Sequence, residues 1–255
     1  MSAVTTPAAA GVQWNLAGPV ATITLCRPEV LNAQTPSTWT ALRDVGRELP
    51  GDVRVVVVRG AGRAFSAGLD LAAAQALLPD LAALRPDDAD ARIAGYQEAF
   101  TWLHRPDLIS VAAVQGHAIG AGFQLALACD LRILADDAQL SMAEVRLGLV
   151  PDLAGTARLV DLVGYARALE ICVTGRRMGA AEADRIGLAN LVVPVAELDA
   201  AVADCTAAVL ASPREAVIEI KALLAGAVGR SPVAQQAAER AAQVRRIREL
   251  AGLGE

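Results

Sequence analysis

Two glycine-rich stretches of the sequence are suited to holding a negatively charged oxygen with backbone groups. The first, GHAIGAGFQLALACD (residues 116–130), has three glycines in seven residues and then an apolar run at helical spacing, which predicts a turn leading into a helix. The first N–H groups of such a helix have no acceptor within it and lie at the positive end of its dipole. The second, GAGRAFSAGLDL (60–71), follows a strand-like run. Either turn alone is explained by the tight bend that glycine permits, but side by side they would form an oxyanion hole.

The same stretches come close to two other motifs. The dinucleotide-binding motif G-x-G-x-x-G has its third glycine where this chain has Leu125, and no acidic residue follows at the spacing that would hold a ribose. The segment AFSAG (64–68) is one residue short of the serine-hydrolase motif G-x-S-x-G around Ser66. A triad there would need His104 or His117, and a lone histidine is more often a hydrogen-bonded structural residue. The dinucleotide hypothesis therefore fails, and the hydrolase hypothesis is weak.

The composition narrows the class of partner. The chain has 255 residues and a formal net charge of −5, and its few basic pairs lie near the C-terminus, which argues against a nucleic-acid partner. No run reaches the roughly 18 apolar residues of a membrane span, and the first residues lack the pattern of a signal peptide. The four cysteines are far apart, with no C-x-x-C pair. We therefore expect free buried thiols, no metal site, no membrane partner and a cytoplasmic location.

The elements that carry the two turns alternate as in an α/β protein. Predicted strands lie at residues 20–26, 53–59, 109–114 and 131–135. Residues 71–99, which contain two prolines, are predicted to form short helices and loops. Predicted helices lie at residues 37–49, 121–129, 196–211, 214–225 and 232–250. The change to helices alone predicts a core domain over residues 1–195 and a helical C-terminal region over 196–255.

Several motifs, taken in order, are similar to those of the enoyl-CoA hydratase/isomerase family, also called the crotonase family. They are RPEVLNA (27–33), GAGRAFSAGLDL (60–71), GHAIGAGFQLALACD (116–130), SMAEVRLGLVPD (141–152), GTARL (155–159), TGRRM (174–178) and ADRIGLA (183–189). The resemblance implies an α/β, crotonase-like spiral of β-β-α repeats whose helical C-terminal region makes contacts in a homotrimer or a dimer of trimers. It also implies an acyl-CoA thioester as the ligand, with no cofactor other than the coenzyme A of the substrate.

The resemblance assigns roles to residues around the two turns. The two oxyanion amides would be those of Leu69 and Ala121, whose apolar side chains suit a site that uses only the N–H groups. The channel for coenzyme A and the thioester would be lined by Ala33, Ala67, Asp70 and Leu71. Arg27 and Arg63 would meet phosphates of coenzyme A, although each is also explained as an ordinary surface residue.

The residues expected to act as acid and base match the family pattern only in part. Hydratases of the family typically use two glutamates, whereas this chain resembles them at Glu144 but has Gln124 at the other position. A carboxamide can hold a water but cannot accept its proton. One carboxylate is enough to move a double bond from a 3-enoyl-CoA to a 2-enoyl-CoA. Asp152, where some isomerases of the family have an acidic residue, is either a second proton carrier or the N-cap of the next helix.

Double-bond isomerisation is therefore slightly favoured over hydration, with Glu144 as the acid/base group. Hydration is weakened by Gln124 but not excluded, since losing one of two such groups leaves a slow enzyme rather than an inactive one. The alternatives are a catalytically weak acyl-CoA-binding member of the family and a serine hydrolase around Ser66.

Overall fold

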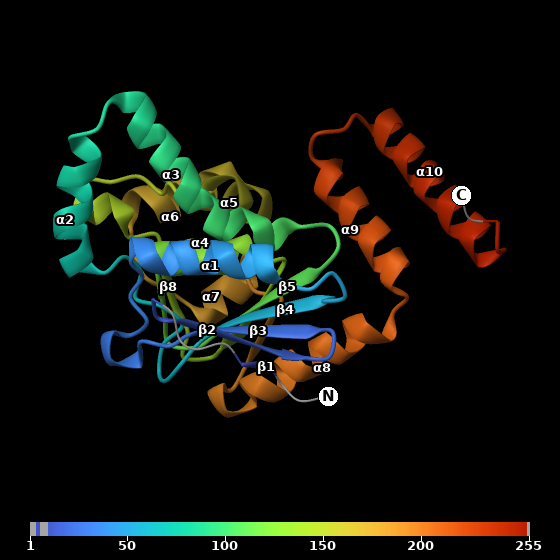
Figure 1. The fold of residues 1–255 in the computed structure, drawn as a ribbon, viewed down its shortest axis with the longest axis horizontal. Coiled ribbons are helices and arrows are strands. Elements are labelled where there is room, and N and C mark those ends of the chain that lie inside the picture. Colours follow the sequence, from blue (N-terminus) through green and yellow to red (C-terminus); the bar gives the residue numbers. More distant parts are fainter. Residues whose placement is uncertain (1–3, 6–9, 254–255) are drawn as a thin grey trace.

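A seven-stranded sheet lies at the centre of the fold (Figure 1), in a computed structural model that describes residues 4–5 and 10–253. The strand order is β1-β2-β3-β4-β5-β7-β10. The pairs β1/β2 and β2/β3 are antiparallel, and the pairs from β3 onward are parallel. The strands are β1 (Val4–Thr5), β2 (Val12–Ala17), β3 (Val20–Leu25), β4 (Val55–Gly60), β5 (Ile109–Val114), β7 (Leu131–Ala135) and β10 (Leu191–Val193).

The central strands are buried on both faces, which explains their continuous runs of β-branched residues. In β4, Val56 and Val58 belong to the larger hydrophobic cluster, and Val55 and Val57 belong to a second cluster on the opposite face. This alternation follows from the two-residue repeat of a strand. The four strands predicted from the sequence correspond to β3, β4, β5 and β7, so the predicted α/β core is confirmed.

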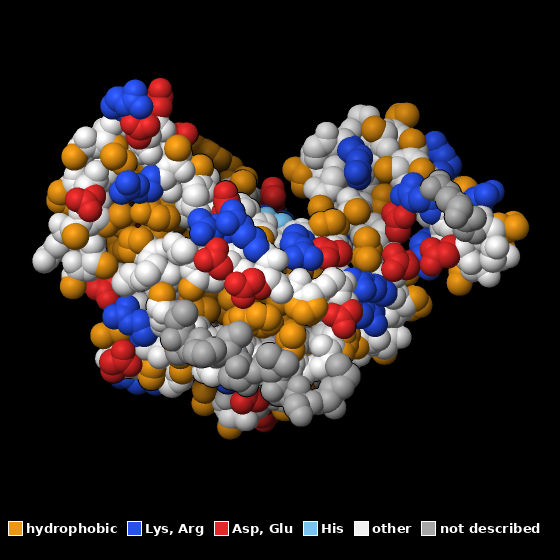
Figure 2. Space-filling view, in the orientation of Figure 1, with side chains coloured by type: hydrophobic (Ala, Val, Ile, Leu, Met, Phe, Trp, Pro, Cys, Tyr) orange, Lys and Arg blue, Asp and Glu red, His pale blue; other side chains and the backbone are white. Residues whose placement is uncertain are grey.

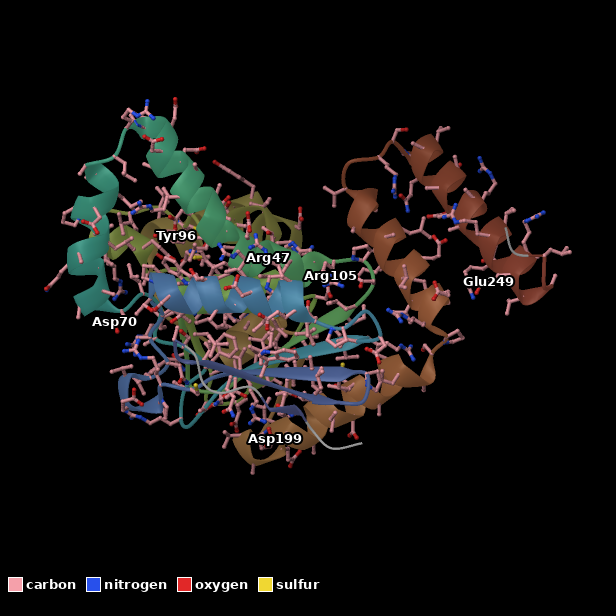
Figure 3. All side chains as sticks on the ribbon, in the orientation of Figure 1. Arg47, Asp70, Tyr96, Arg105, Asp199 and Glu249 are labelled. Carbon is pink, nitrogen blue, oxygen red and sulfur yellow. The ribbon has the colours of Figure 1, made fainter. Side chains whose placement is uncertain are left out.

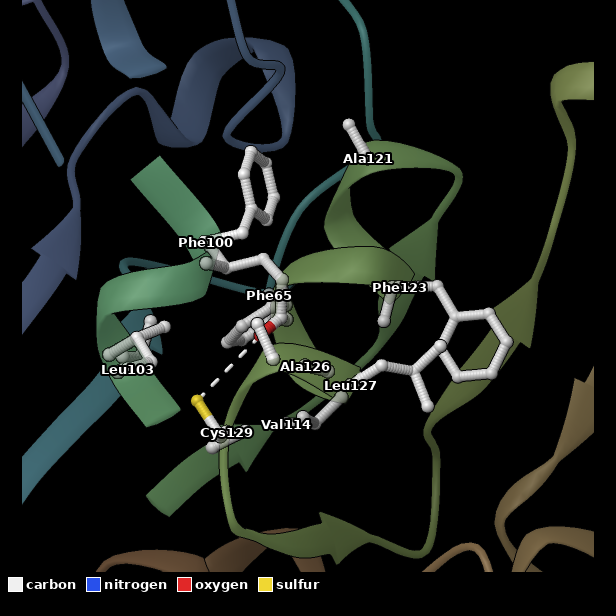
Figure 4. Close-up of a cluster of buried hydrophobic side chains, with 14 of the residues drawn as sticks. Phe65, Phe100, Leu103, Val114, Ala121, Phe123, Ala126, Leu127 and Cys129 are labelled. Carbon is white, nitrogen blue, oxygen red and sulfur yellow. Dashed lines mark hydrogen bonds between the residues drawn. The ribbon is translucent and has the colours of Figure 1, made fainter. Parts of the chain in front are cut away.

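Helices α1 (Pro36–Glu48), α3 (Pro86–Thr101) and α4 (Ala121–Ala128) pack on the face with the larger cluster. Helix α1 begins with a capping box, in which the hydroxyl of Thr35 accepts from the N–H of Thr38 and the hydroxyl of Thr38 accepts from the N–H of Thr35. The indole of Trp39 packs against the ring of Tyr96 with their centroids 5.0 Å apart, and Figure 3 shows Tyr96 above α1. Every residue of α4 is buried, and Figure 4 shows the apolar side chains around it.

The other face of the sheet is covered by α8 (Leu198–Ala211), whose Leu198 and Val202 complete the second cluster. Arg59 at the end of β4 forms an ion pair of 2.9 Å with Asp199 of α8, and Figure 3 shows Asp199 below the sheet. The core therefore has helices on both sides of a mainly parallel sheet.

A second, three-stranded sheet lies beside α4. Its strands are β6 (His117–Ile119), β8 (Gln139–Ser141) and β9 (Met178–Gly179), in the order β6-β8-β9. Isolated bridges pair Ser66 with Ala118 and Gln34 with Leu69, so both glycine-rich stretches are joined into one block. These short strands were not predicted, because runs of two or three residues show no clear period-two pattern.

The segment between the two glycine-rich stretches differs from the prediction of short helices and loops. It forms α2 (Leu71–Ala82), whose N-cap Asp70 accepts from the N–H groups of Ala72 and Ala73, and then α3. Pro79 lies inside α2, and the helix ends four residues later at its C-cap. Pro86 is the first residue of α3, where the missing N–H costs nothing. The two prolines therefore lie one within a helix and one at a helix start, so neither prevents helix formation here.

Helices α9 (Arg214–Ala227) and α10 (Pro232–Leu250) form an arm that extends from the core (Figure 1). The helices of the C-terminal region agree with the predicted ranges to within two residues, and the domain boundary at residue 195 stays a prediction. Lys221 of α9 forms an ion pair of 2.7 Å with Asp130, which joins the arm to the core. Figure 2 shows the hollow between the arm and the core, a cleft of about 780 Å³.

The remaining helices are α5 (Gly155–Val163), α6 (Tyr165–Thr174) and α7 (Ala180–Arg185), and the 3₁₀ turns are Pro28–Val30, Trp102–His104, Glu144–Leu147 and Val195–Glu197. The four cysteines are free, as predicted, but only Cys129 is fully buried. No helix in the part of the chain described here is both long enough and apolar enough to cross a membrane.

Candidate active site

The two glycine-rich turns lie against each other. Gly68 has φ +88°, Gly120 has φ +50°, and both conformations favour glycine. A Cβ atom placed on Gly68 would lie 2.4 Å from the carbonyl oxygen of Ile119 and 3.5 Å from the nitrogen of Ala121. Only a residue without a side chain permits this approach. The residues that follow the two glycines, Leu69 and Ala121, are those predicted to supply the oxyanion amides.

The hydrogen bonds around these residues leave the two N–H groups unused. In the bridge between Gln34 and Leu69, the N–H of Gln34 donates to the Gly68 carbonyl (2.7 Å), and the N–H of Asp70 donates to the Gln34 carbonyl (2.8 Å). The N–H of Leu69 therefore points away from Gln34, as alternate groups of an extended segment do. Ala121 is the first residue of α4. Among residues 4–5 and 10–253, neither N–H has a hydrogen-bond acceptor.

The carboxyl group of Glu144 lies beside the second turn. Glu144 follows β8 and opens a 3₁₀ turn, and a Cβ atom on Gly120 would lie 3.3 Å from its Oε1 atom. Its Oε2 atom is buried and has no hydrogen-bond partner within the described residues. Burial raises the pKa of Glu144, hydrogen bonds from its own backbone and from Gln124 oppose that rise, and the nearby charge of Asp152 adds to it. A proton-accepting group is thus next to the predicted oxyanion site.

Gln124, in the first turn of α4, contacts Glu144 directly. Its Nε2 atom donates to Oε1 of Glu144 at 2.7 Å. Its Oε1 atom accepts from the N–H of Leu153 at 2.9 Å and from that of Gly155 at 3.3 Å. The side chain is almost fully buried, at 1% exposure. The structure therefore brings together two of the three residues predicted to carry the acid–base chemistry.

Asp152 lies near them but on the surface. Its carbonyl oxygen accepts a hydrogen bond of 2.7 Å from the side chain of Gln97 on α3. The residue as a whole is exposed, but partial burial of its carboxyl group raises the pKa of Asp152. Helix α5 begins at Gly155 with Ala154 as its N-cap, so the alternative that Asp152 caps this helix is wrong.

Most of the residues expected to line the ligand channel have structural contacts of their own. Arg27 donates to the carbonyl of Ala33 (3.0 Å) and to the carboxylate of Asp70 (3.1 Å). The N–H of Ala73 and the guanidinium of Arg27 lower the pKa of Asp70, which Figure 3 shows at the start of α2. Ala67 is half-buried, whereas Leu71 is exposed.

Ser66 has the contacts of a structural residue. It is fully buried, and its hydroxyl donates to the Asn32 carbonyl at 2.8 Å and accepts from the side chain of Gln34 at 3.1 Å. Ser66 pairs with Ala118, so the side chain of the adjacent His117 points to the opposite face of its strand. His104 lies in the cleft beside α9 instead. The structure places neither histidine beside Ser66, which leaves the hydrolase hypothesis without support.

Three polar residues at the site had no assigned role. The side chain of Asn32 donates to the carbonyls of Ala61 and Ala64 and so holds the first turn. Gln34 is buried between Ser66 and the indole of Trp39. Gln97 holds the loop before α5. The sequence signal for Asn32 was its place in the RPEVLNA motif; Gln34 and Gln97 have no comparable signal.

The family model for enoyl-CoA hydratase/isomerase matches residues 16–250. The chain belongs to this family. Its curated relatives include a carnitinyl-CoA dehydratase of Escherichia coli (strain K12), which is 42% identical over 185 residues, or 71% of this chain and 67% of that protein. A "Probable enoyl-CoA hydratase" of Mycobacterium tuberculosis (strain CDC 1551 / Oshkosh) is 36% identical over 181 residues, or 70% of this chain and 67% of that protein.

Solved structures of other family members confirm the crotonase-like fold with its helical C-terminal region. A Thermobifida fusca YX protein in complex with acetoacetyl-CoA has a TM-score of 0.90 and 49% identity, covering 94% of this chain and 96% of its own. An enoyl-CoA hydratase from Polaromonas sp. JS666 has a TM-score of 0.84 and 29% identity, covering 92% and 91%. The family identified from the sequence motifs is therefore confirmed.

Proposed function

We propose that this member of the enoyl-CoA hydratase/isomerase family acts on an acyl-CoA thioester, with the N–H groups of Leu69 and Ala121 as an oxyanion hole and Glu144 as the acid/base group. The observation that carries the proposal is the meeting of the two glycine turns with the Glu144 carboxyl group beside them. The acetoacetyl-CoA complex of the Thermobifida fusca relative supports a thioester ligand.

The two amides would act on the carbonyl oxygen of the thioester. When a base removes a proton from Cα, the electron pair moves toward this oxygen and an enolate forms. Backbone donors that are already in place stabilise this charge without reorganisation, and removing one such donor typically costs about 2.7–4 kcal/mol of barrier. The free N–H groups of Leu69 and Ala121 fit this role because no other group among the described residues uses them.

Glu144 would transfer the proton. In its ionised form it accepts the proton from Cα of a 3-enoyl-CoA, which gives a dienolate, and its protonated form then returns that proton to Cγ to give the 2-enoyl-CoA. The burial that raises the pKa of Glu144 makes its carboxylate a stronger base. Isomerisation is favoured over hydration because Gln124, unlike a second glutamate, cannot accept the proton of an attacking water.

Activity assays with 2-enoyl-CoA and 3-enoyl-CoA test this proposal. We expect Glu144→Gln to lower turnover by about 10²–10⁴, while calorimetry shows unchanged binding of acetoacetyl-CoA. Glu48→Gln, on the exposed end of α1, is the matched control and should behave as wild type. Unchanged turnover in Glu144→Gln would remove Glu144 as the base. Binding without turnover in the wild type would favour the weak acyl-CoA-binding alternative, and labelling of Ser66 by an active-site serine probe would favour the hydrolase.

The ligand channel is proposed to run past Ala33, Ala67, Asp70, Leu71 and Arg27, with no cofactor other than the coenzyme A of the substrate. Asp152 is proposed as a second proton carrier.

Assembly as a homotrimer or a dimer of trimers is supported by apolar side chains that α9 and α10 leave exposed, among them Ile220, Leu224 and Ile247. Light scattering would count the subunits, and a monomer would refute this assembly. The cytoplasmic location stays a prediction.

A further inference from the structure

We propose that Gln124 is a positioning residue: its carboxamide is locked in one orientation and holds one oxygen of Glu144, so that the other oxygen is the one that exchanges a proton with the substrate. This inference rests on the proposed role of Glu144 as the base. It concerns a position at which the resemblance led us to expect a second proton-transferring carboxylate.

The orientation of the Gln124 carboxamide is fixed by its partners. Its oxygen accepts from two backbone N–H groups, those of Leu153 (2.9 Å) and Gly155 (3.3 Å), and these groups can only donate. A flipped carboxamide would place NH₂ against two N–H donors. The NH₂ group must therefore face Glu144, whose Oε1 lies 2.7 Å away.

Packing prevents the side chain from leaving this position. Gln124 is 1% exposed and lies on a helix in which every residue is buried. A Cβ atom on Gly155 would lie 2.8 Å from Cγ of Gln124, so the start of α5 packs directly on the glutamine side chain. Release of the carboxamide would leave buried polar groups without partners, which is costly.

As a result, the two carboxyl oxygens of Glu144 have different surroundings. Oε1 is occupied by Gln124, whereas Oε2 is buried without a hydrogen-bond partner in the described part of the chain. Both atoms lie within 4 Å of the Cβ position of Gly120, directly before the amide of Ala121. A thioester whose oxygen lies at that amide would therefore be next to the carboxyl group, and Oε2 is the oxygen that Gln124 leaves without a hydrogen bond.

The same bond also affects when Glu144 is ionised. A donor to a carboxylate favours the charged form, so Gln124 lowers the pKa that burial raises. The other titratable groups that interact with Glu144 are Asp152, whose charge raises the pKa of Glu144, and Cys172 of α6, whose own pKa Glu144 raises. Removing the Gln124 donor should therefore move the ionisation of Glu144 to higher pH.

The test compares Gln124→Met, Gln124→Glu and the control Gln13→Met on β2, away from the site. We expect Gln124→Met to lower kcat by on the order of 10²-fold, the loss typical of a misplaced catalytic group, with KM changed far less. The acid limb of its pH profile should move to higher pH. Gln124→Glu keeps the shape and should move this limb in the same direction, because two adjacent carboxylates cannot both ionise easily. Gln13→Met should match wild type.

A wild-type kcat and pH profile in Gln124→Met would overturn the inference, as would a loss confined to KM. If Gln124→Met does not fold, the pH profile of Gln124→Glu decides alone. A ¹³C NMR titration of the Glu144 carboxyl group, assigned with Glu144→Gln, separates this inference from the proposed function. It detects the change in pKa even if the wild type turns over no enoyl-CoA, and an unchanged pKa in Gln124→Met would contradict the role of Gln124.

Discussion

The position of the Glu144 carboxyl group suits proton transfer but does not stabilise the fold. Burial raises its pKa above the ordinary value of 4.5, and Oε2 has no hydrogen-bond partner among the described residues to offset the loss of water. Gln124 compensates for only one of the two oxygens. The residue types at 124 and 144 could be read from the motifs, but their contact could not. It depends on the N–H groups of Leu153 and Gly155, which orient the carboxamide.

The difference in stability between wild type and Glu144→Gln should depend on pH. Between 4.5 and the raised pKa, folded Glu144 keeps a proton that the unfolded chain has released. Its proton-linked contribution to stability is therefore fully present below about pH 4.5 and is lost as the pH rises through the folded pKa. We expect Glu144→Gln to melt at a higher temperature than wild type at pH 8, with a smaller gap at pH 5. Thermal melts measure this, and a lower melting temperature at pH 8 would contradict it.

At the scale of elements, the two glycine turns act as one unit because bridges from Ser66 and Leu69 fasten the first turn on both sides. The strands β3, β4, β5 and β7 were predictable because their β-branched runs are long. The small sheet of β6, β8 and β9 was not, because its strands have two or three residues each. The lengths of α2 and α3 were predicted too short because the prolines at 79 and 86 suggested breaks, although Pro86 is compatible with a helix start.

Two glycine-to-alanine substitutions, one in the first glycine-rich turn and one in α3, should have opposite effects on stability. At Gly68, φ is +88° and a Cβ atom would lie 2.4 Å from the Ile119 carbonyl oxygen, so Gly68→Ala should cost about 1–3 kcal/mol of unfolding free energy and most of the activity. Gly95 lies inside α3 with open space around it, so Gly95→Ala should stabilise by about 0.5–1 kcal/mol and leave activity unchanged. Denaturant unfolding and turnover measure both. A neutral Gly68→Ala would contradict the close approach of the turns.

At the scale of the whole molecule, the arm of α9 and α10 reaches away from the core and is joined to it by the pair of Lys221 and Asp130. The proline positions and helical periodicity predicted the lengths of these helices well. The direction of the arm was not predictable, since it depends on long-range contacts of α9 with Asp130, Leu108 and Gly51 and on the chain turn at Pro213. The exposed apolar side chains of the arm are a further property that periodicity alone did not locate.

A crystal structure of the protein with bound acetoacetyl-CoA tests the central claim most directly. The account predicts the thioester oxygen at about 2.7–3.1 Å from the backbone nitrogens of both Leu69 and Ala121, with Oε2 of Glu144 facing Cα. A thioester oxygen held by only one of these amides, or by neither, would contradict the account.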